Sequence, residues 1–381
     1  MQPLPSTRQP STRVILVRHG RSTFNDQGRY QGSSNQSVLS EKGIATSQLV
    51  GKYLSRVPID AIYASPLCRV QQTALEISKT MIDRPPIITS SDLKEISLSH
   101  WEGLTYAQVK EQFADEYHRW QSQPHEFELP TDLEPYTNGN IAVATKTYFP
   151  VQNLYREAHQ FWSNTLSRHA GGTLLVVSHS GTIHALLSTA LGIASSAHHS
   201  LQQSNCGISE LRFSGQSFSQ ASVQLHQLNQ TSAIGETLPK LKVSKKGLRL
   251  LLLPSEYSSL DSHTSIAEQL KDMPIDFYLS TDEAREQLQP PIQQQSKALW
   301  LCAQKSDFLQ DWQRYLCQAK RSAETLMTGL AIAPTHSIQK LLIQTLGGDI
   351  EHYHRLAIHP THLSVIHYPY THKPVVQAVN L

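Results

Sequence analysis

The sequence is poor in cysteine and has no long apolar run. Its four cysteines are widely spaced and form no Cys-x-x-Cys pair, so neither a disulfide framework nor a thiolate metal site is indicated, and a reducing compartment fits. No stretch of 18 uncharged apolar residues occurs, which argues against a membrane-spanning helix. Residues 1–12 hold three prolines but no apolar signal-peptide core. We therefore expect a cytoplasmic protein without a membrane partner, with a disordered tail at residues 1–12.

Charge of one sign is also scarce. The chain has 33 basic and 31 acidic residues, a formal net charge of +2, and no block of five like charges. This balance argues against a general nucleic-acid binder but still allows a local cationic pocket. With 39% hydrophobic and 17% charged residues, disorder, collagen and coiled coil are excluded. A chain of 381 residues is longer than one core usually organises, so two domains are expected.

Apolar runs alternate with helical patterns in the first part of the chain. The run 14–17 is rich in β-branched residues, which predicts a buried parallel strand. Ser65-Pro66 after the second run resembles an N-cap followed by proline at the first helical position. Alternation of this kind is typical of an α/β fold. The predicted elements are strands at 14–17, 59–64 and 173–177, helices at 40–54, 65–77, 106–121, 154–168 and 182–191, and a closing hairpin at 208–213 and 223–228.

The last third repeats the first part in weakened form. Residues 249–253 echo 13–17, and Pro274-Ile275-Asp276 echoes Pro58-Ile59-Asp60 at a constant offset. We infer a duplicated fold with a degenerate second copy. Opposite Arg18, His19 and His179 the copy has Pro254, Ser255 and Pro334, whereas Arg285 stands opposite Arg69.

Two predicted strands end in a histidine beside small residues. These ends are Arg18-His19-Gly20 and Ser178-His179-Ser180-Gly181, and the carboxyl edge of an open parallel sheet is where ligands bind. With Arg69 at the start of the helix after the second strand, they would form a cationic cluster that is repulsive unless an anion lies within it. Guanidinium groups match phosphoryl oxygens, so the expected anion is a phosphate.

The string Leu16–Asn25 resembles the signature of the histidine phosphatase superfamily, in the branch that contains cofactor-dependent phosphoglycerate mutase. The resemblance extends over about 13–232 through four further motifs in family order: Leu39-Ser40-Glu41-Lys42-Gly43; Ser65-Pro66-Leu67-Cys68-Arg69 with Gln72-Thr73-Ala74; Leu93-Lys94-Glu95 with Trp101-Glu102-Gly103; and Ser178-His179-Ser180-Gly181. It implies a three-layer α/β/α sandwich of the phosphoglycerate mutase-like type. The domains expected are a catalytic domain at 13–233 with a cap at about 98–150, a linker at 234–246, and an inert copy at 247–381 that packs on the first.

The same resemblance assigns roles to individual residues. It makes His19 the nucleophile, which attacks as neutral imidazole with its second nitrogen held by a neighbouring carbonyl and becomes phosphohistidine. Arg18, Arg69 and His179 would hold the equatorial oxygens of the phosphoryl group. Glu95 would donate a proton, which calls for a shielded position. Because arginines neutralise the charge, no metal and no other cofactor are expected.

A second set of residues is assigned to substrate binding. These are Asn25, Gln31, Gly32 and Ser180. For Asn25, Gln31 and Gly32 the alternative is ordinary loop chemistry in a turn. For Ser180 the alternative to a phosphate contact at a helix start is a plain N-cap.

The region before the third strand bears on substrate choice. Related phosphatases carry Pro-Gly-Gly-Glu-Ser there, whereas this chain has Asn138-Gly139-Asn140-Ile141, and it lacks the arginine-rich insertion of the mutases. We therefore expect a metal-independent phosphatase acting on a small sugar or carboxylated sugar phosphate. Candidate activities are 2-carboxyarabinitol 1-phosphate phosphatase, sugar bisphosphatase and α-ribazole phosphatase. The alternatives are a phosphoglycerate mutase or a noncatalytic phosphate sensor.

Overall fold

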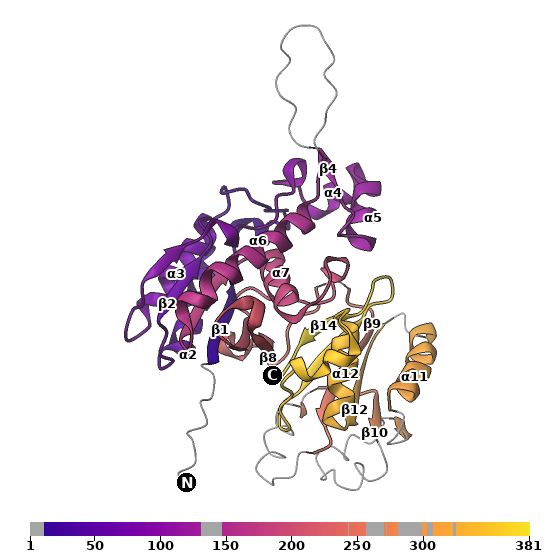
Figure 1. The fold of residues 1–381 in the computed structure, drawn as a ribbon. Helices are drawn as coiled ribbons and strands as arrows, with labels where there is room; N and C mark the ends of the chain where they lie inside the picture. Colours follow the sequence, from indigo (N-terminus) through magenta and orange to yellow (C-terminus); the bar gives the residue numbers. More distant parts are fainter. Residues whose placement is uncertain are drawn as a thin grey trace, which may run out of the picture. The chain divides into compact units, whose positions relative to one another are not determined.

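The computed structural model describes residues 11–130, 147–242, 244–256, 270–271, 273–280, 299–302, 308–322 and 325–381. Figure 1 shows their helices and strands. Internal contacts divide the chain into two units: a first unit up to residue 198 that includes 214–221, and a second unit of 199–213 and 222–381. The predicted domain, linker and tail boundaries stay predictions.

The first sheet is six-stranded, with the order β3-β2-β6-β1-β7-β8. The pairs β1–β6, β2–β6 and β2–β3 are parallel. Residues 14–17 are almost fully buried, which explains their unbroken apolar run in a central parallel strand. The strands are β1 (Ser11–Arg18), β2 (Ala61–Ala64), β3 (Ile87–Thr89), β6 (Thr173–Ser178), β7 (Ile208–Ser214) and β8 (Ser222–Gln230).

Helices of the first unit pack on its strands and on one another. Helix α3 packs against β2 and β6, and α7 packs against β1. Helices α2 and α3 lie side by side, as do α6 and α7 (Figure 1). Their bounds are α1 (Thr23–Asp26), α2 (Glu41–Leu54), α3 (Cys68–Lys79), α6 (Pro150–Thr165) and α7 (Ser180–Leu191). The predicted strand–helix alternation is confirmed.

Two predicted helix boundaries are wrong. The helix after β2 begins at Cys68 with Leu67 as its N-cap, so Ser65 is not the cap. The predicted helix 106–121 is two helices, α4 (Tyr106–Gln112) and α5 (Ala114–Ser122), because the backbone leaves the helical region at Phe113. By contrast, Ser40 caps α2 as predicted, with its hydroxyl accepting from the Gly43 amide at 3.2 Å.

The predicted cap contains α4, α5 and a two-stranded sheet of β4 (Leu129–Pro130) and β5 (Thr147–Tyr148). Trp101 is fully buried and contacts the rings of Trp120 and Phe127, so this aromatic residue is core rather than an exposed pocket wall. The stretch Asn138–Ile141 lies outside the described residues.

The second unit contains another six-stranded sheet, with the order β11-β10-β12-β9-β13-β14. When strands are numbered within each sheet, this is the order of the first sheet. The register agrees too: Arg13 is opposite Thr173, and Arg249 is opposite Thr328. The elements are β9 (Gly247–Pro254), β10 (Phe277–Ser280), β11 (Leu299–Cys302), α11 (Phe308–Ser322), β12 (Leu326–Ala333), α12 (Thr335–Thr345), β13 (Ser364–Tyr368) and β14 (Val375–Ala378).

This common strand order supports the predicted duplication, which stays a prediction. Arg285, the predicted counterpart of Arg69, lies outside the described residues. Short 3₁₀ helices complete the two units at Ser91–Leu93, Ser99–Trp101, Leu166–His169, Ser195–Ala197, Phe218–Gln220, Ser232–Ile234 and Ile350–Arg355. Among the described residues, no helix combines the length and apolar character that crossing a bilayer requires.

Candidate active site

His19 lies at the carboxyl end of β1, where its backbone amide donates to the Ser178 carbonyl of β6 at 2.8 Å. Its ring is 2% exposed, and Nδ1 lies 2.7 Å from the Gly20 carbonyl oxygen. A carbonyl only accepts, so Nδ1 carries the proton of this hydrogen bond. In the neutral ring the lone pair is therefore on Nε2, the form of histidine that can attack an electrophile.

His179 follows β6 and caps α7. Its ring centroid lies 5.3 Å from that of His19, with 65° between the ring planes. Complete burial, together with the charges of Arg69, His19 and Arg18, holds the pKa of His179 well below its usual value. The ring is therefore neutral. The two predicted histidines meet at one sheet edge although they are far apart in the sequence.

Arg69 is the second residue of α3 and is completely buried. Its Nη1 donates to the Ser34 carbonyl at 2.7 Å and its Nη2 to the Gly32 carbonyl at 2.8 Å. Burial lowers the pKa of this guanidinium to about 10, with repulsion from Arg18 acting in the same direction and the Glu95 charge opposing it. Arg18 is half-buried at the last position of β1. The predicted cationic cluster is thus assembled.

Two nitrogen atoms of this cluster are buried without a hydrogen-bond partner among the described residues. They are Nε of Arg69 and Nδ1 of His179. Leaving a buried donor unsatisfied costs about 1–3 kcal/mol. An oxyanion between the two side chains would satisfy both, and the positive charge of Arg69 would favour it. The arrangement therefore suits a phosphoryl group.

Glu95 lies against the start of α7. Its Oε1 accepts from the Ile96 amide at 3.0 Å and from Thr182 through the amide at 3.2 Å and the hydroxyl at 3.4 Å. Its Oε2 accepts from the Gly181 amide at 3.2 Å. The side chain is partly exposed, so the shielded position expected for it is not found. Amides at a helix start favour a negative charge, which accounts for the place this carboxylate takes.

Asn25 and Gln31 both turn their side chains toward Ser22. The Asn25 oxygen accepts from the Ser22 amide at 3.3 Å and from its hydroxyl at 3.1 Å, which forms a capping box at the start of α1. The Gln31 oxygen lies 2.8 Å from the same hydroxyl. These contacts agree with the alternative interpretation, in which Asn25 and Gln31 are ordinary residues of a turn. A contact of either residue with substrate stays a prediction.

Gly32 is required by the backbone. Its φ is +50°, and a Cβ at this position would collide with the Glu102 carboxylate. Glu102 accepts from the Ser33 amide at 2.7 Å and from the Leu98 amide at 3.2 Å. Together with Arg69 it fixes the loop that follows the nucleophile. Glu102 belongs to a motif that resembles the family, but no sequence pattern indicated this role.

Ser180 is the first residue of α7, and His179 is its N-cap. The interpretation of Ser180 as the N-cap is therefore wrong by one residue. Its place at a helix start remains compatible with the predicted contact to a substrate oxygen.

Two further residues of the site were missed. Thr73 is fully buried, and its hydroxyl accepts from the Gly20 amide at 3.0 Å and donates to the Arg69 carbonyl at 2.7 Å. Ser65 is also fully buried, and its hydroxyl lies 2.8 Å from Nε2 of His179. Both belong to motifs that resemble the family, but their contacts join segments far apart in the chain.

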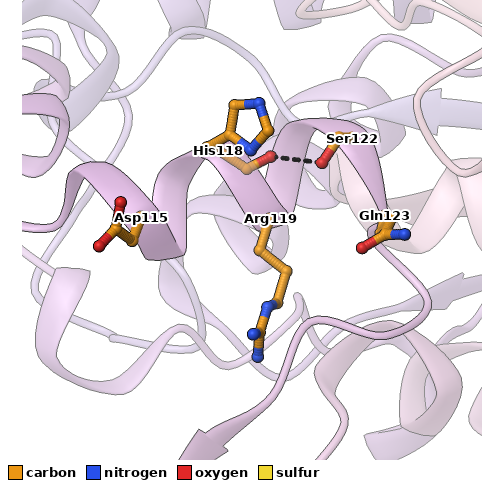
Figure 2. A pocket seen from close by; sticks show the side chains of 5 residues that line it. All are labelled: Asp115, His118, Arg119, Ser122 and Gln123. Carbon is orange, nitrogen blue, oxygen red and sulfur yellow. Dashed lines mark hydrogen bonds between the residues drawn. The ribbon is translucent and has the colours of Figure 1, made fainter.

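A separate shallow hollow lies on α5 (Figure 2). Its Arg119 pairs with Glu128 at 3.2 Å, and the Ser122 hydroxyl donates to the His118 carbonyl at 2.8 Å. None of its lining residues is one of the predicted site residues; they are Asp115, His118, Arg119, Ser122 and Gln123. This hollow is not the phosphate site.

Comparison with known families decides the classification. The model of the histidine phosphatase superfamily (branch 1) matches residues 14–225, which is more than half of the chain. The chain belongs to this superfamily. The predicted resemblance and the phosphoglycerate mutase-like α/β fold are confirmed. The match includes all five residues predicted to be catalytic.

Individual members of the superfamily extend this result. A 2-carboxy-D-arabinitol-1-phosphatase of Triticum aestivum is 34% identical over 252 residues, which cover 66% of this chain and 47% of that protein. The chain therefore spans about half the length of this relative. A protein named phosphoserine phosphatase 1, from Hydrogenobacter thermophilus, is 32% identical over 181 residues, which cover 48% of this chain and 77% of that protein.

Solved structures are also similar to part of the chain. An α-ribazole phosphatase from Shigella flexneri has a TM-score of 0.45 and 21% sequence identity. The alignment covers 57% of this chain and 96% of that chain.

Proposed function

We propose that this chain is a metal-independent phosphatase that hydrolyses a small phosphate monoester through a phosphohistidine at His19. The observation that carries the proposal is the pair of rings of His19 and His179, whose centroids are 5.3 Å apart beside Arg18 and Arg69. A nucleophilic nitrogen next to buried, unsatisfied donors is what phosphoryl transfer requires.

In the first step Nε2 of His19 attacks phosphorus, and the bond from phosphorus to the alkoxide leaving group breaks. Arg18, Arg69 and His179 hold the oxygens on which charge accumulates. Glu95 gives its proton to the departing alkoxide. The Oε2 atom is the better carrier of that proton, because it accepts one amide whereas Oε1 accepts two amides and a hydroxyl.

In the second step a water molecule attacks phosphorus and the bond to Nε2 breaks. Glu95, now a carboxylate, takes the proton that the water loses, and inorganic phosphate leaves. His19 returns to its starting form with Nδ1 still bonded to the Gly20 carbonyl. The cycle consumes one water per phosphate ester, and the positive charge of the arginines replaces a metal ion.

A carboxylated substrate is the finer part of the proposal. The names of the two relatives specify carboxyarabinitol phosphate and phosphoserine, and both compounds carry a carboxylate near the phosphate. We propose a small carboxylated sugar or amino-acid phosphate, with a neutral sugar phosphate as the poorer substrate. Turnover to inorganic phosphate, rather than transfer of the phosphoryl group to another hydroxyl of phosphoglycerate, separates this activity from that of a mutase.

The test is hydrolysis of phosphoserine and of glucose 6-phosphate in the presence of EDTA. We expect phosphoserine to be preferred, and we expect His19→Ala to lose at least ~10³-fold in kcat, because no other side chain replaces the covalent nucleophile. His169→Ala is the matched control, since His169 lies in the helix before β6, at the opposite end of that strand from the site. Undiminished turnover by His19→Ala would disprove the mechanism. Phosphate binding without turnover in the unmodified chain would identify a sensor.

A further inference from the structure

Ser65 is held rigidly between β6 and α3. Its amide donates to the Val177 carbonyl at 3.3 Å, and its carbonyl accepts from the Gln71 side chain at 2.6 Å. The residue is completely buried. Because its backbone is anchored on both sides, its hydroxyl oxygen has a fixed position, 2.8 Å from Nε2 of His179.

The direction of this hydrogen bond follows from the other partner of the hydroxyl. The Leu67 amide donates to the same oxygen at 3.4 Å, so the oxygen already accepts one proton. Its own proton needs an acceptor, and among the described residues that acceptor is Nε2 of His179. A neutral imidazole has one accepting and one donating nitrogen. If Nε2 accepts, Nδ1 carries the proton.

This tautomer has a consequence at the site. Nδ1 of His179 is buried and has no hydrogen-bond partner among the described residues. As a proton donor it would complement a phosphoryl oxygen. In the other tautomer, a lone pair on Nδ1 would repel that oxygen and the Ser65 hydroxyl would lose its acceptor. One hydroxyl therefore decides whether the ring attracts or repels substrate.

We propose that Ser65 is a positioning residue that fixes His179 as the tautomer protonated on Nδ1, so that this nitrogen donates to the phosphoryl group. The statement about the phosphoryl group rests on the function proposed above. The statement about the tautomer does not, because it follows from contacts within the protein. The two can therefore fail separately.

The tautomer is tested by ¹⁵N NMR of the protein labelled at histidine, near neutral pH, with His179→Gln to assign the ring. In the unmodified chain we expect a protonated Nδ1 and an unprotonated Nε2. In Ser65→Ala we expect the Nε2–H form to appear, and Ser65→Thr should restore the original spectrum because it keeps the hydroxyl. The matched control is Ser178→Ala, which removes the buried hydroxyl of the residue before His179, a hydroxyl that donates to the Leu93 carbonyl instead.

Activity supplies the second measurement. We expect Ser65→Ala to lower kcat/KM by ~10–100-fold, the usual effect of losing a partner that orients a functional histidine. Ser65→Thr should recover much of this loss. A protonated Nε2 in the unmodified chain, or a spectrum of folded Ser65→Ala identical to that of the unmodified chain, would overturn the proposal even if His19→Ala is inactive. Activity in His19→Ala would overturn the proposed function and leave the tautomer result standing.

Discussion

The two six-stranded sheets share their strand order but differ at the carboxyl ends of their strands. In the first unit β1 ends in Arg18 and is followed by His19, whereas in the second β9 ends in Pro254 and is followed by Ser255. Both central strands are buried and apolar. The strand order therefore depends on apolar runs that both sheets have, and the proposed chemistry depends on a few residues at strand ends of the first sheet.

The two units also differ in the residues at the start of helix α7 and of helix α12. In the first unit α7 begins after His179, and the distant Glu95 accepts from its amides. In the second unit α12 begins after Pro334, and Glu256, two residues past β9, accepts from the Thr335 amide at 2.9 and 3.0 Å. A side chain next to β9 thus satisfies this helix start. That the second copy is inert stays a prediction.

The largest effect that separates the units concerns one arginine in each, Arg69, which is buried, and Arg249, which is partly buried. Burial lowers the pKa of both Arg69 and Arg249, but Arg249 is bonded to Gln377 and to the Pro239 carbonyl. We expect Arg69→Met to lower kcat/KM by ~10²–10³-fold, as expected for loss of a group that stabilises transition-state charge. Arg249→Met should cost about 1–3 kcal/mol of unfolding free energy through unpaired polar groups and should leave kcat/KM unchanged.

Steady-state kinetics give kcat/KM of both variants, and urea denaturation gives their unfolding free energies. Equal losses of activity in Arg69→Met and Arg249→Met would abolish the distinction between a catalytic and a structural arginine. It would also mean that a residue of the second unit contributes to catalysis.

The strand ends and their convergence could be predicted from the sequence, because parallel strands 14–17 and 173–177 must end at one edge. The matching register of the second sheet was visible as constant offsets between similar residues. What could not be predicted depends on contacts between distant segments. Arg69 bonds to the backbone of the loop after the nucleophile, and Ser65 bonds to the ring of His179.

For two residues of the site, Ser65 and Glu95, the sequence-based expectation about the local environment differs from the structure. A serine before proline is a common helix start, so Ser65 looked like a cap although its hydroxyl is used elsewhere. Glu95 was expected to be shielded because of its role, whereas the start of α7 holds it in a partly exposed place. Resemblance to a family can therefore predict which residue has a role, but it does not predict how exposed that residue is.

A smaller effect concerns acid stability. Burial lowers the pKa of His179, with Arg69, His19 and Arg18 adding to it, and burial also lowers that of His367, where the Lys246 carbonyl opposes the shift. Because the folded rings take up protons at lower pH than the same rings in the unfolded chain, the unfolding free energy falls as the pH falls below about 6.5, by at most ~1.4 kcal/mol per pH unit for each ring.

We expect His179→Gln to flatten this dependence more than His367→Gln, since only His179 is surrounded by cations without a compensating carbonyl. Urea midpoints measured at several pH values between about 7 and 5 give the slopes. Equal slopes in the unmodified chain and His179→Gln would mean that folding does not lower the pKa of this ring, contrary to its surroundings.

The smallest effect is expected at the start of α12. Glu256 is exposed and accepts from both the amide and the hydroxyl of Thr335, so Glu256→Gln should lower the unfolding free energy by about 0.3–1 kcal/mol, the usual value of a carboxylate at a helix start. In a double-mutant cycle with Thr335→Val, the two losses should be partly non-additive, because valine removes the hydroxyl contact of the carboxylate but leaves its contact with the amide. Additive losses would show that the carboxylate is not stabilised by the Thr335 hydroxyl.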